Sequence, residues 1–171
     1  MTDQSQSITI LTAEDDPDDR VMVEEAFQEN GQDNNLFFVE DGLELLQYLR
    51  KQGSYTTPTS APRPDLILLD LNMPRMDGHQ ALAEIKADPD LRSIPVVVLT
   101  ISNTQEDILR TYDLGGAGFI IKPESFEGMV EVVKVLNQYW FEVVELASGE
   151  FMKNVKNNHY ARSSSGFIQI G

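Results

Sequence analysis

The chain has 171 residues with 28 acidic and 13 basic side chains, which gives a formal net charge of −15. A chain with this charge repels phosphate backbones, which argues against broad nucleic-acid binding. The sequence has no cysteine, which excludes disulfides and thiolate metal sites. The N-terminus lacks the basic segment and long apolar run of a signal peptide, and no stretch approaches the ~20 apolar residues of a membrane span. We therefore expect a cytoplasmic protein that binds neither nucleic acid nor membrane.

Apolar runs alternate with amphipathic segments, beginning with a predicted strand over 8–13. A helix is predicted over 16–30, because Asp16 can cap it and Gly31 can end it. The pattern continues in chain order with a strand over 36–39, a helix over 43–50, a loop over 53–64, a strand over 66–69, a helix over 79–86, a strand over 95–99, a helix over 104–114, a strand over 119–121 and a helix over 126–144.

The predicted strands are apolar without the period-two alternation of a half-exposed strand, which is typical of a parallel sheet covered on both faces. Five such strands alternating with five helices predict an α/β fold with a doubly wound parallel sheet. Residues 147–171 are rich in Ser, Asn and Gly, and we expect a flexible or non-native tail there. We expect no output domain after residue 146.

Polar side chains follow four of the five predicted strands. They are Glu14, Asp15 and Asp16 after the first strand, Asp70 after the third, Thr100 at the end of the fourth and Lys122 after the fifth. Because the carboxyl ends of parallel strands meet at one edge of a sheet, we expect these side chains to share a crevice. The acidic groups would repel one another, and a hard divalent cation such as Mg²⁺ would neutralise them.

Such a crevice can support phosphoryl transfer, in which catalysis is mostly positioning and charge neutralisation. Asp70 is the predicted nucleophile, because a carboxylate that attacks phosphorus forms an acyl phosphate. Lys122 can hold a phosphoryl oxygen as a point charge, and the Thr100 hydroxyl can donate to another.

The segments EDD, DLNMPRMDG, LT and KP, in this order and spacing, resemble the receiver domain of bacterial response regulators. The resemblance covers roughly residues 7–145, and we set the domain at 7–146. It implies a flavodoxin-like, CheY-like fold with strand order 2-1-3-4-5. It also implies that a histidine kinase phosphorylates Asp70, and that the chain slowly loses the phosphate without being a turnover enzyme.

The resemblance further implies a set of roles at the crevice. Asp15, Asp70 and the Asn72 main-chain carbonyl would bind Mg²⁺, Glu14 would reach the metal through water, and Thr100 and Lys122 would contact the phosphoryl group. Phosphorylation would draw Thr100 inward, with Phe119 following, and would reshape the face of the fourth helix, fifth strand and fifth helix. The Lys122–Pro123 peptide bond would be cis, which only proline allows at low cost.

The sequence also resembles, in finer detail, the small regulators that pair with phytochrome kinases, through its ILTAEDDPDD opening and its LTISNTQEDI segment. It departs from the commonest receiver pattern at Phe119, where the ring has no hydroxyl, and at Ile101, where Ala is usual. We expect output through a changed protein surface, which forms a homodimer or binds a downstream partner or a relay histidine. Apolar side chains late in the last helix suit such an interface, namely Tyr139, Trp140, Phe141 and Val144, while Val132, Val133 and Leu136 suit packing on the sheet.

Two alternatives remain. A haloacid dehalogenase-type phosphatase needs an acidic residue two positions after the nucleophile, where this chain has Asn72. A degenerate receiver would act as an interaction module without phosphorylation, against which the intact crevice residues argue. Asp16 is interpreted as a helix cap rather than a ligand, and His79 and His159 as surface residues.

Overall fold

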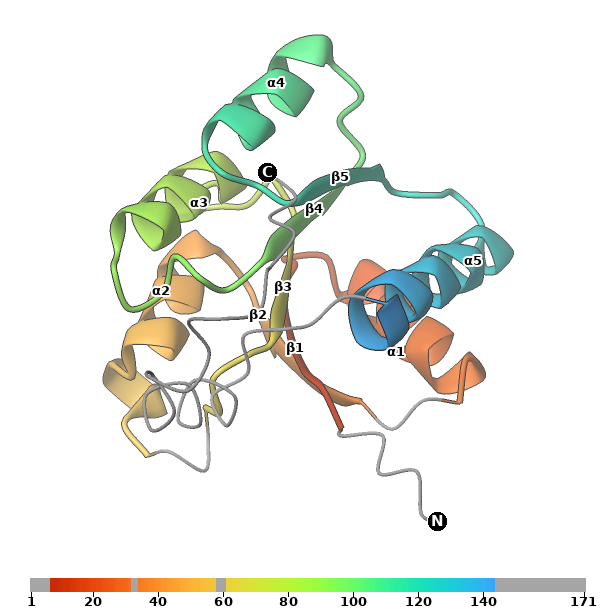
Figure 1. The fold of residues 1–171 in the computed structure, drawn as a ribbon, viewed down its shortest axis with the longest axis horizontal. Helices are drawn as coiled ribbons and strands as arrows, with labels where there is room; N and C mark the ends of the chain where they lie inside the picture. Colours follow the sequence, from red (N-terminus) through yellow and green to blue (C-terminus); the bar gives the residue numbers. More distant parts are fainter. Residues whose placement is uncertain (1–6, 32–33, 58–60, 144–171) are drawn as a thin grey trace, which may run out of the picture.

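The computed structural model describes residues 7–31, 34–57 and 61–143 (Figure 1). The predicted tail over 147–171, with His159, lies outside these residues, as does Val144.

The observed elements follow the predicted order, and their ends differ from the predicted ones by at most one residue, except at the end of the last helix. The strands are β1 (Thr9–Ala13), β2 (Asn35–Val39), β3 (Leu66–Leu69), β4 (Val96–Thr100) and β5 (Gly118–Ile121). The α-helices are α1 (Pro17–Glu29), α2 (Gly42–Arg50), α3 (Gly78–Ala87), α4 (Gln105–Asp113) and α5 (Phe126–Leu136). A short 3₁₀ turn, η1 (Gly53–Tyr55), lies in the predicted loop, and a π-helix, η2 (Asn137–Val143), follows α5.

The strands form one parallel sheet in the order β2-β1-β3-β4-β5, which confirms the predicted doubly wound fold. In the register of the two central strands, Ala13 of β1 lies opposite Leu69 of β3. The residues that follow these two strands therefore emerge side by side at the carboxyl edge of the sheet.

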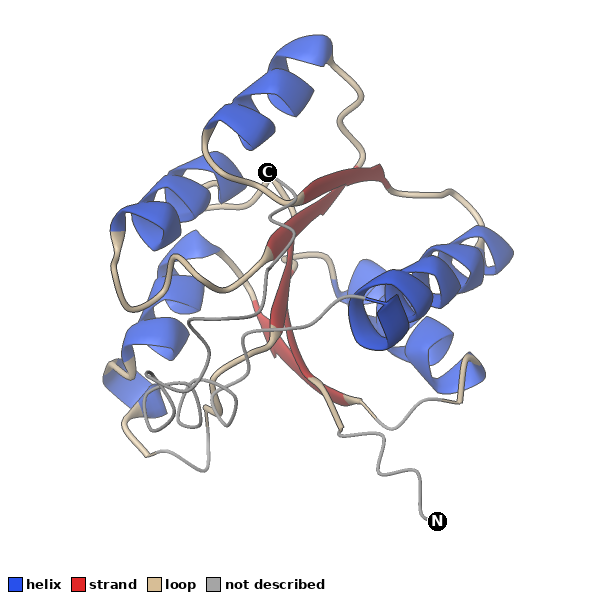
Figure 2. Ribbon diagram, viewed as in Figure 1, coloured by secondary structure: helices blue, strands red, loops and turns tan. Residues whose placement is uncertain are grey.

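Helices cover both faces of the sheet, as Figure 2 shows, with α1 and α5 on one side and α2 and α3 on the other. Within β3, alternate residues serve the two layers: Leu66 and Leu68 pack under α1 and α5, whereas Ile67 and Leu69 pack under α2 and α3. Both sets are buried, which explains why the strand reads as a continuous apolar run.

Each α-helix begins with a polar cap just after a strand or loop. The caps are Asp16 for α1, Asp41 for α2, Asp77 for α3, Thr104 for α4 and Ser125 for α5. The prediction that Asp16 caps the first helix is confirmed, because its carboxylate accepts from the backbone N–H groups of Asp18 and Asp19.

The last helix is shorter than predicted as a regular α-helix, because its hydrogen-bond pattern changes to that of a π-helix at Asn137. Val133 and Leu136 are buried against the sheet, and Val132 packs beside them, as predicted. Trp140 is half-buried and packs partly against the same layer, whereas Tyr139 is 52% exposed. Among the helices that the structure describes, none combines the length and apolar character needed to cross a membrane.

Gly78 matters to the site because α3 begins against the backbone of the β3 end. A Cβ atom at this position would lie 2.3 Å from the carbonyl oxygen of Asp70 and 2.8 Å from Cα of Leu71. The Gly78 N–H also donates to the Leu71 carbonyl at 2.9 Å. A glycine is required here for space, so that the helix start can touch the residue that follows β3.

We predict that Gly78→Ala lowers the free energy of unfolding by about 2 kcal/mol, because the added methyl group meets backbone atoms that cannot rotate away. Urea unfolding followed by circular dichroism measures the change. Gly118→Ala is the matched control, since a Cβ there would only touch Val97 side-chain atoms at 3.5 and 3.6 Å. Equal stability of the two variants would contradict the prediction.

Candidate functional site

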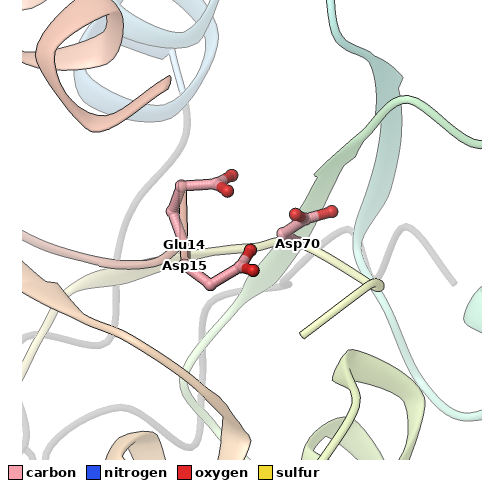
Figure 3. Close-up of side chains that lie close together, drawn as sticks. All are labelled: Glu14, Asp15 and Asp70. Carbon is pink, nitrogen blue, oxygen red and sulfur yellow. The ribbon is translucent and has the colours of Figure 1, made fainter. Parts of the chain in front are cut away.

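Three carboxylates from two adjacent strand ends converge at the carboxyl edge of the sheet. Glu14 and Asp15 follow β1 and Asp70 follows β3, and one oxygen atom of each lies within 4.8 Å of the others (Figure 3). Glu14 and Asp70 are buried and Asp15 is exposed. The sheet holds their backbones in place, because the Asp70 N–H donates to the Ala13 carbonyl at 3.1 Å and the Glu14 N–H to the Val39 carbonyl at 2.9 Å.

Lys122 brings an ammonium group to this cluster from the end of β5. Its Nζ donates to Glu14 Oε2 at 2.5 Å, to Asp19 Oδ2 at 2.9 Å and to Asp70 Oδ2 at 3.3 Å. The Lys122 side chain is only 6% exposed, so water does little to screen these contacts. The Lys122 N–H also donates to the Thr100 carbonyl at 2.7 Å, which ties the ends of β4 and β5 together.

The cluster holds more negative than positive charge, and this governs its protonation. Burial, together with the nearby charge of Asp70, raises the pKa of Glu14 to about 7, although the hydrogen bond from Lys122 acts in the opposite direction. For Lys122, burial alone lowers the pKa, but the bonds to Glu14 and Asp19 and the charge of Asp70 outweigh it and raise the pKa above its ordinary value. The ammonium therefore stays charged, and Glu14 holds its proton more readily than an ordinary glutamate does.

These residues fit a hard divalent cation. Mg²⁺ and similar ions prefer carboxylate, carbonyl and water oxygens, and the cluster offers oxygens from three acidic side chains. The exposed side chain of Asp15 leaves one side of the cluster open to solvent. A cation there would also offset the negative charge that Lys122 alone leaves uncompensated.

The remaining predicted residues lie on or next to β3, β4 and β5. Thr100 ends β4 and is fully buried, and its Oγ1 accepts from the Ser102 N–H at 3.4 Å. Asn72 is exposed, and its N–H donates to Asp70 Oδ1 at 3.5 Å. Phe119 is half-buried on β5, opposite Val98. Ile101 is 71% exposed, so its side chain does not crowd the interior beside Thr100.

Asp19 is a site residue that the sequence analysis missed. It lies in the first turn of α1 and supplies the third carboxylate bound by Lys122. Its position in the opening turn of the helix that follows the acidic strand end was the available signal, because that turn must face the same edge of the sheet.

A second missed contact supports the loop between β3 and α3. Arg75 adopts a left-handed backbone conformation with φ of 63°, and its Nε donates to the buried carboxylate of Asp41 at 2.6 Å. The Met76 carbonyl accepts from the Gly42 N–H at 3.0 Å. The loop that carries Asn72 is therefore attached to the start of α2. Burial works to raise the pKa of Asp41, but hydrogen bonds from Glu44 and Arg75 outweigh it and lower the pKa.

Two expectations need correction. His79 was assigned to the surface, but it is buried at 4% exposure and its Nε2 lies 2.9 Å from Thr111 Oγ1, because the start of α3 packs against α4. The Lys122–Pro123 bond was expected to be cis, but no peptide bond in the described ranges is cis. The trans isomer is the intrinsically more stable one even before proline.

Comparison with known proteins gives one consistent answer. The family "Response regulator receiver domain" matches residues 10–134. The chain is 39% identical over 137 residues to the response regulator Rcp1 of Synechocystis sp., a match that covers 80% of this chain and 91% of that protein.

Solved structures agree. The phosphorylated cyanobacterial phytochrome response regulator RcpA matches with a TM-score of 0.78 and 39% identity, covering 84% of this chain and 100% of that chain. The Mn²⁺-bound form of Rcp1 matches with a TM-score of 0.74 and 38% identity, covering 82% and 99% of the two chains. On the family match, the sheet topology and these relatives, this chain belongs to the response regulator receiver domain family.

Proposed function

We propose that this chain is a single-domain response regulator that accepts a phosphoryl group from a histidine kinase on Asp70, with Mg²⁺ bound beside it. The observation that carries the proposal is the convergence of Glu14, Asp15, Asp70 and Lys122 at one edge of the sheet. Family membership supports it, because the same segments of the sequence that carry the family resemblance supply these residues.

In the proposed transfer, a carboxylate oxygen of Asp70 attacks the phosphorus of a kinase phosphohistidine. The P–N bond breaks, its electron pair returns to the imidazole, and the product is an acyl phosphate. Lys122, already 3.3 Å from Asp70 Oδ2, would hold one phosphoryl oxygen, and the Thr100 hydroxyl would donate to another. The chain would lose this phosphate slowly by itself rather than turn over a substrate.

In the same proposal, Asp15, Asp70 and the Asn72 main-chain carbonyl hold Mg²⁺, and Glu14 reaches it through water. The bound cation supplies charge neutralisation for an incoming phosphoryl group. The carboxylate cluster supports the roles of Glu14, Asp15 and Asp70 in this set. The Mn²⁺-bound form of Rcp1, a relative with 38% identity, supports binding of a divalent cation.

The proposed partner is a sensor histidine kinase, with a phytochrome as the candidate, and the proposed location of this chain is the cytoplasm. The support is the similarity to regulators described as phytochrome response regulators, including RcpA. The acidic charge of the chain, −15, supports a protein partner rather than nucleic acid.

The proposed output is a changed surface on α4, β5 and α5, which a second copy of the chain could recognise. In this mechanism Thr100 moves toward the phosphoryl group and Phe119 follows it. Exposed apolar side chains on these elements support a protein contact there, and they are Leu109 and Tyr112 of α4, Ile121 of β5 and Val135 of α5.

We expect Asp70→Asn to abolish phosphorylation while leaving the fold intact, because the amide cannot attack phosphorus. The wild-type protein should gain one phosphate from acetyl phosphate and Mg²⁺, as measured by mass spectrometry. Asp16→Asn is the matched control, since Asp16 is an exposed cap at the same edge and Asn caps equally well. Failure of the wild-type protein to gain phosphate would favour the degenerate receiver, and phosphate uptake by Asp70→Asn at the wild-type rate would refute the assigned position.

Mg²⁺ affinity should rise about tenfold between pH 6 and pH 8, because the proton on Glu14, with its pKa raised to about 7, competes with the cation. In the metal-free protein the same raised pKa means that the native state binds more protons than the unfolded state between pH 4.5 and about 7. This contribution to the unfolding free energy therefore falls as pH rises through that window. Calorimetric Mg²⁺ titrations at several pH values test the predicted rise in Mg²⁺ affinity. Glu14→Gln should make this affinity nearly independent of pH. A pH-independent affinity in the wild-type protein would contradict it.

Lys122→Ala should still allow modification of Asp70 but should weaken the response to it, because no ammonium remains to draw the phosphoryl group toward β5. Amide NMR shifts of α4 and β5 on addition of beryllofluoride and Mg²⁺ measure the response. Lys134→Ala, a change on the exposed side of α5, is the control. An undiminished response in Lys122→Ala would refute this role.

A further inference from the structure

Helix α4 has a single buried residue in contact with the protein interior. Among its nine residues, Gln105–Asp113, all of which the structure describes, Thr111 alone is buried. Leu109 is 62% exposed and Tyr112 is 51% exposed, so they contribute little apolar burial against the body. Thr111 is therefore the residue of α4 whose contacts lie in the protein interior.

The side chain of Thr111 makes a buried hydrogen bond to His79 of α3. Thr111 Oγ1 lies 2.8 Å from the Asp107 carbonyl and 2.9 Å from His79 Nε2. A carbonyl can only accept, so the single hydroxyl proton of Thr111 points to Asp107. The hydroxyl oxygen must then accept from His79, which requires the proton on Nε2. Burial and the nearby charge of Arg110 lower the pKa of His79, outweighing the opposite effects of Asp107 and Asp77, and so favour its neutral form.

His79 also lies next to the phosphoacceptor segment. Gly78, the residue before it, packs directly on the backbone of Asp70, and its N–H donates to the Leu71 carbonyl at 2.9 Å. A displacement of the backbone at Asp70 would therefore reach His79 through a rigid, close contact.

The start of α4 is attached to the other side of the same site. The Ser102 N–H donates to Thr100 Oγ1 at 3.4 Å, and the Ser102 hydroxyl donates to the Asp107 carboxylate in a short hydrogen bond. The Asp107 carbonyl in turn accepts from Thr111. Two routes thus lead from the site to Thr111, one from Asp70 through α3 and one from Thr100 through Ser102 and Asp107.

We propose that His79 and Thr111 are positioning residues of the switch: their hydrogen bond holds α4 in its resting position, and phosphorylation of Asp70 must release it. The inference rests on the proposed phosphorylation of Asp70. When the Thr100 hydroxyl turns toward the phosphoryl group it leaves the Ser102 N–H, and the anchored first turn of α4 is freed to move. The hydrogen bond between Thr111 and His79 opposes that movement until the hydrogen bond breaks.

The direct test is NMR of the full chain with ¹⁵N-labelled histidine, which gives signals from only two residues because the sequence has two histidines. His159→Gln assigns the signals. In the resting protein His79 should show the neutral form with its proton on Nε2. Addition of beryllofluoride and Mg²⁺ should shift the Nε2 signal in the wild-type protein and not in Asp70→Asn. A resting His79 protonated on Nδ1 alone, or an Nε2 signal that does not move while the Asp70 amide does, would overturn the proposal.

Substitutions at Thr111 and His79 test how much their hydrogen bond changes the affinity for beryllofluoride. Thr111→Val removes the hydroxyl at nearly constant shape, and the affinity for beryllofluoride in the presence of Mg²⁺ should become about three- to tenfold tighter, the size of one net hydrogen bond. Thr111→Ser keeps the hydroxyl and should stay within about twofold of the wild-type affinity. His79→Gln, which keeps a donor at the Nε2 position, should remain closer to wild type than His79→Leu.

An affinity of Thr111→Val equal to or weaker than that of the wild-type protein would overturn the proposal. If this variant does not fold, the comparison of His79→Leu with His79→Gln decides in the same way. The two failures are distinguishable: loss of the proposed function leaves the Asp70 amide unmoved by beryllofluoride, whereas loss of this inference alone leaves that amide shifting and His79 unaffected.

Discussion

A single buried ammonium group faces more carboxylates than it can neutralise, and the chemistry of the site follows from this imbalance. Lys122 contacts Glu14, Asp19 and Asp70, and Asp15 lies beside them. Because Glu14, Asp70 and Lys122 are buried, the negative charge that remains between them must be offset by a proton or by a cation. The proton goes to Glu14, whose pKa is raised to about 7. A divalent cation would replace it and would also prepare the site for a phosphoryl group, which brings further negative charge.

The fold holds these charged residues close together at one edge of the sheet. The strands that deliver the charged residues are buried on both faces, so their apolar side chains fix the register of β1 against β3 and thereby the spacing of Glu14 and Asp70. The helices begin at capped N-termini after these strands, which places partial positive charge near the same edge. Gly78 lets α3 start against the Asp70 carbonyl, so the site and the helices around it form one continuous contact.

The sequence was informative where a residue's role depends on its own strand, and it was less so where the role depends on a distant partner. The continuous apolar run over 66–69 predicted β3, and the polar residue after it predicted Asp70 at the crevice edge. Asp19 was missed because its contact with Lys122 depends on the rotation of α1 about its axis. His79 was misjudged because a polar side chain is usually exposed, and its partner Thr111 lies 32 residues away on another helix. The change to a π-helix after Leu136 has no pattern in the sequence that we could identify.

The charge imbalance is tested most directly by ¹³C NMR of the Glu14 side-chain carboxyl carbon, followed as a function of pH in the metal-free protein and again at saturating Mg²⁺. Glu14→Gln identifies the signal. The account predicts a midpoint near pH 7 without metal, from the pKa of about 7, and a clear shift to lower pH when the cation is bound. A midpoint near the ordinary value of 4.5 in the metal-free protein would contradict it, because Lys122 alone would then be enough to balance the buried carboxylates.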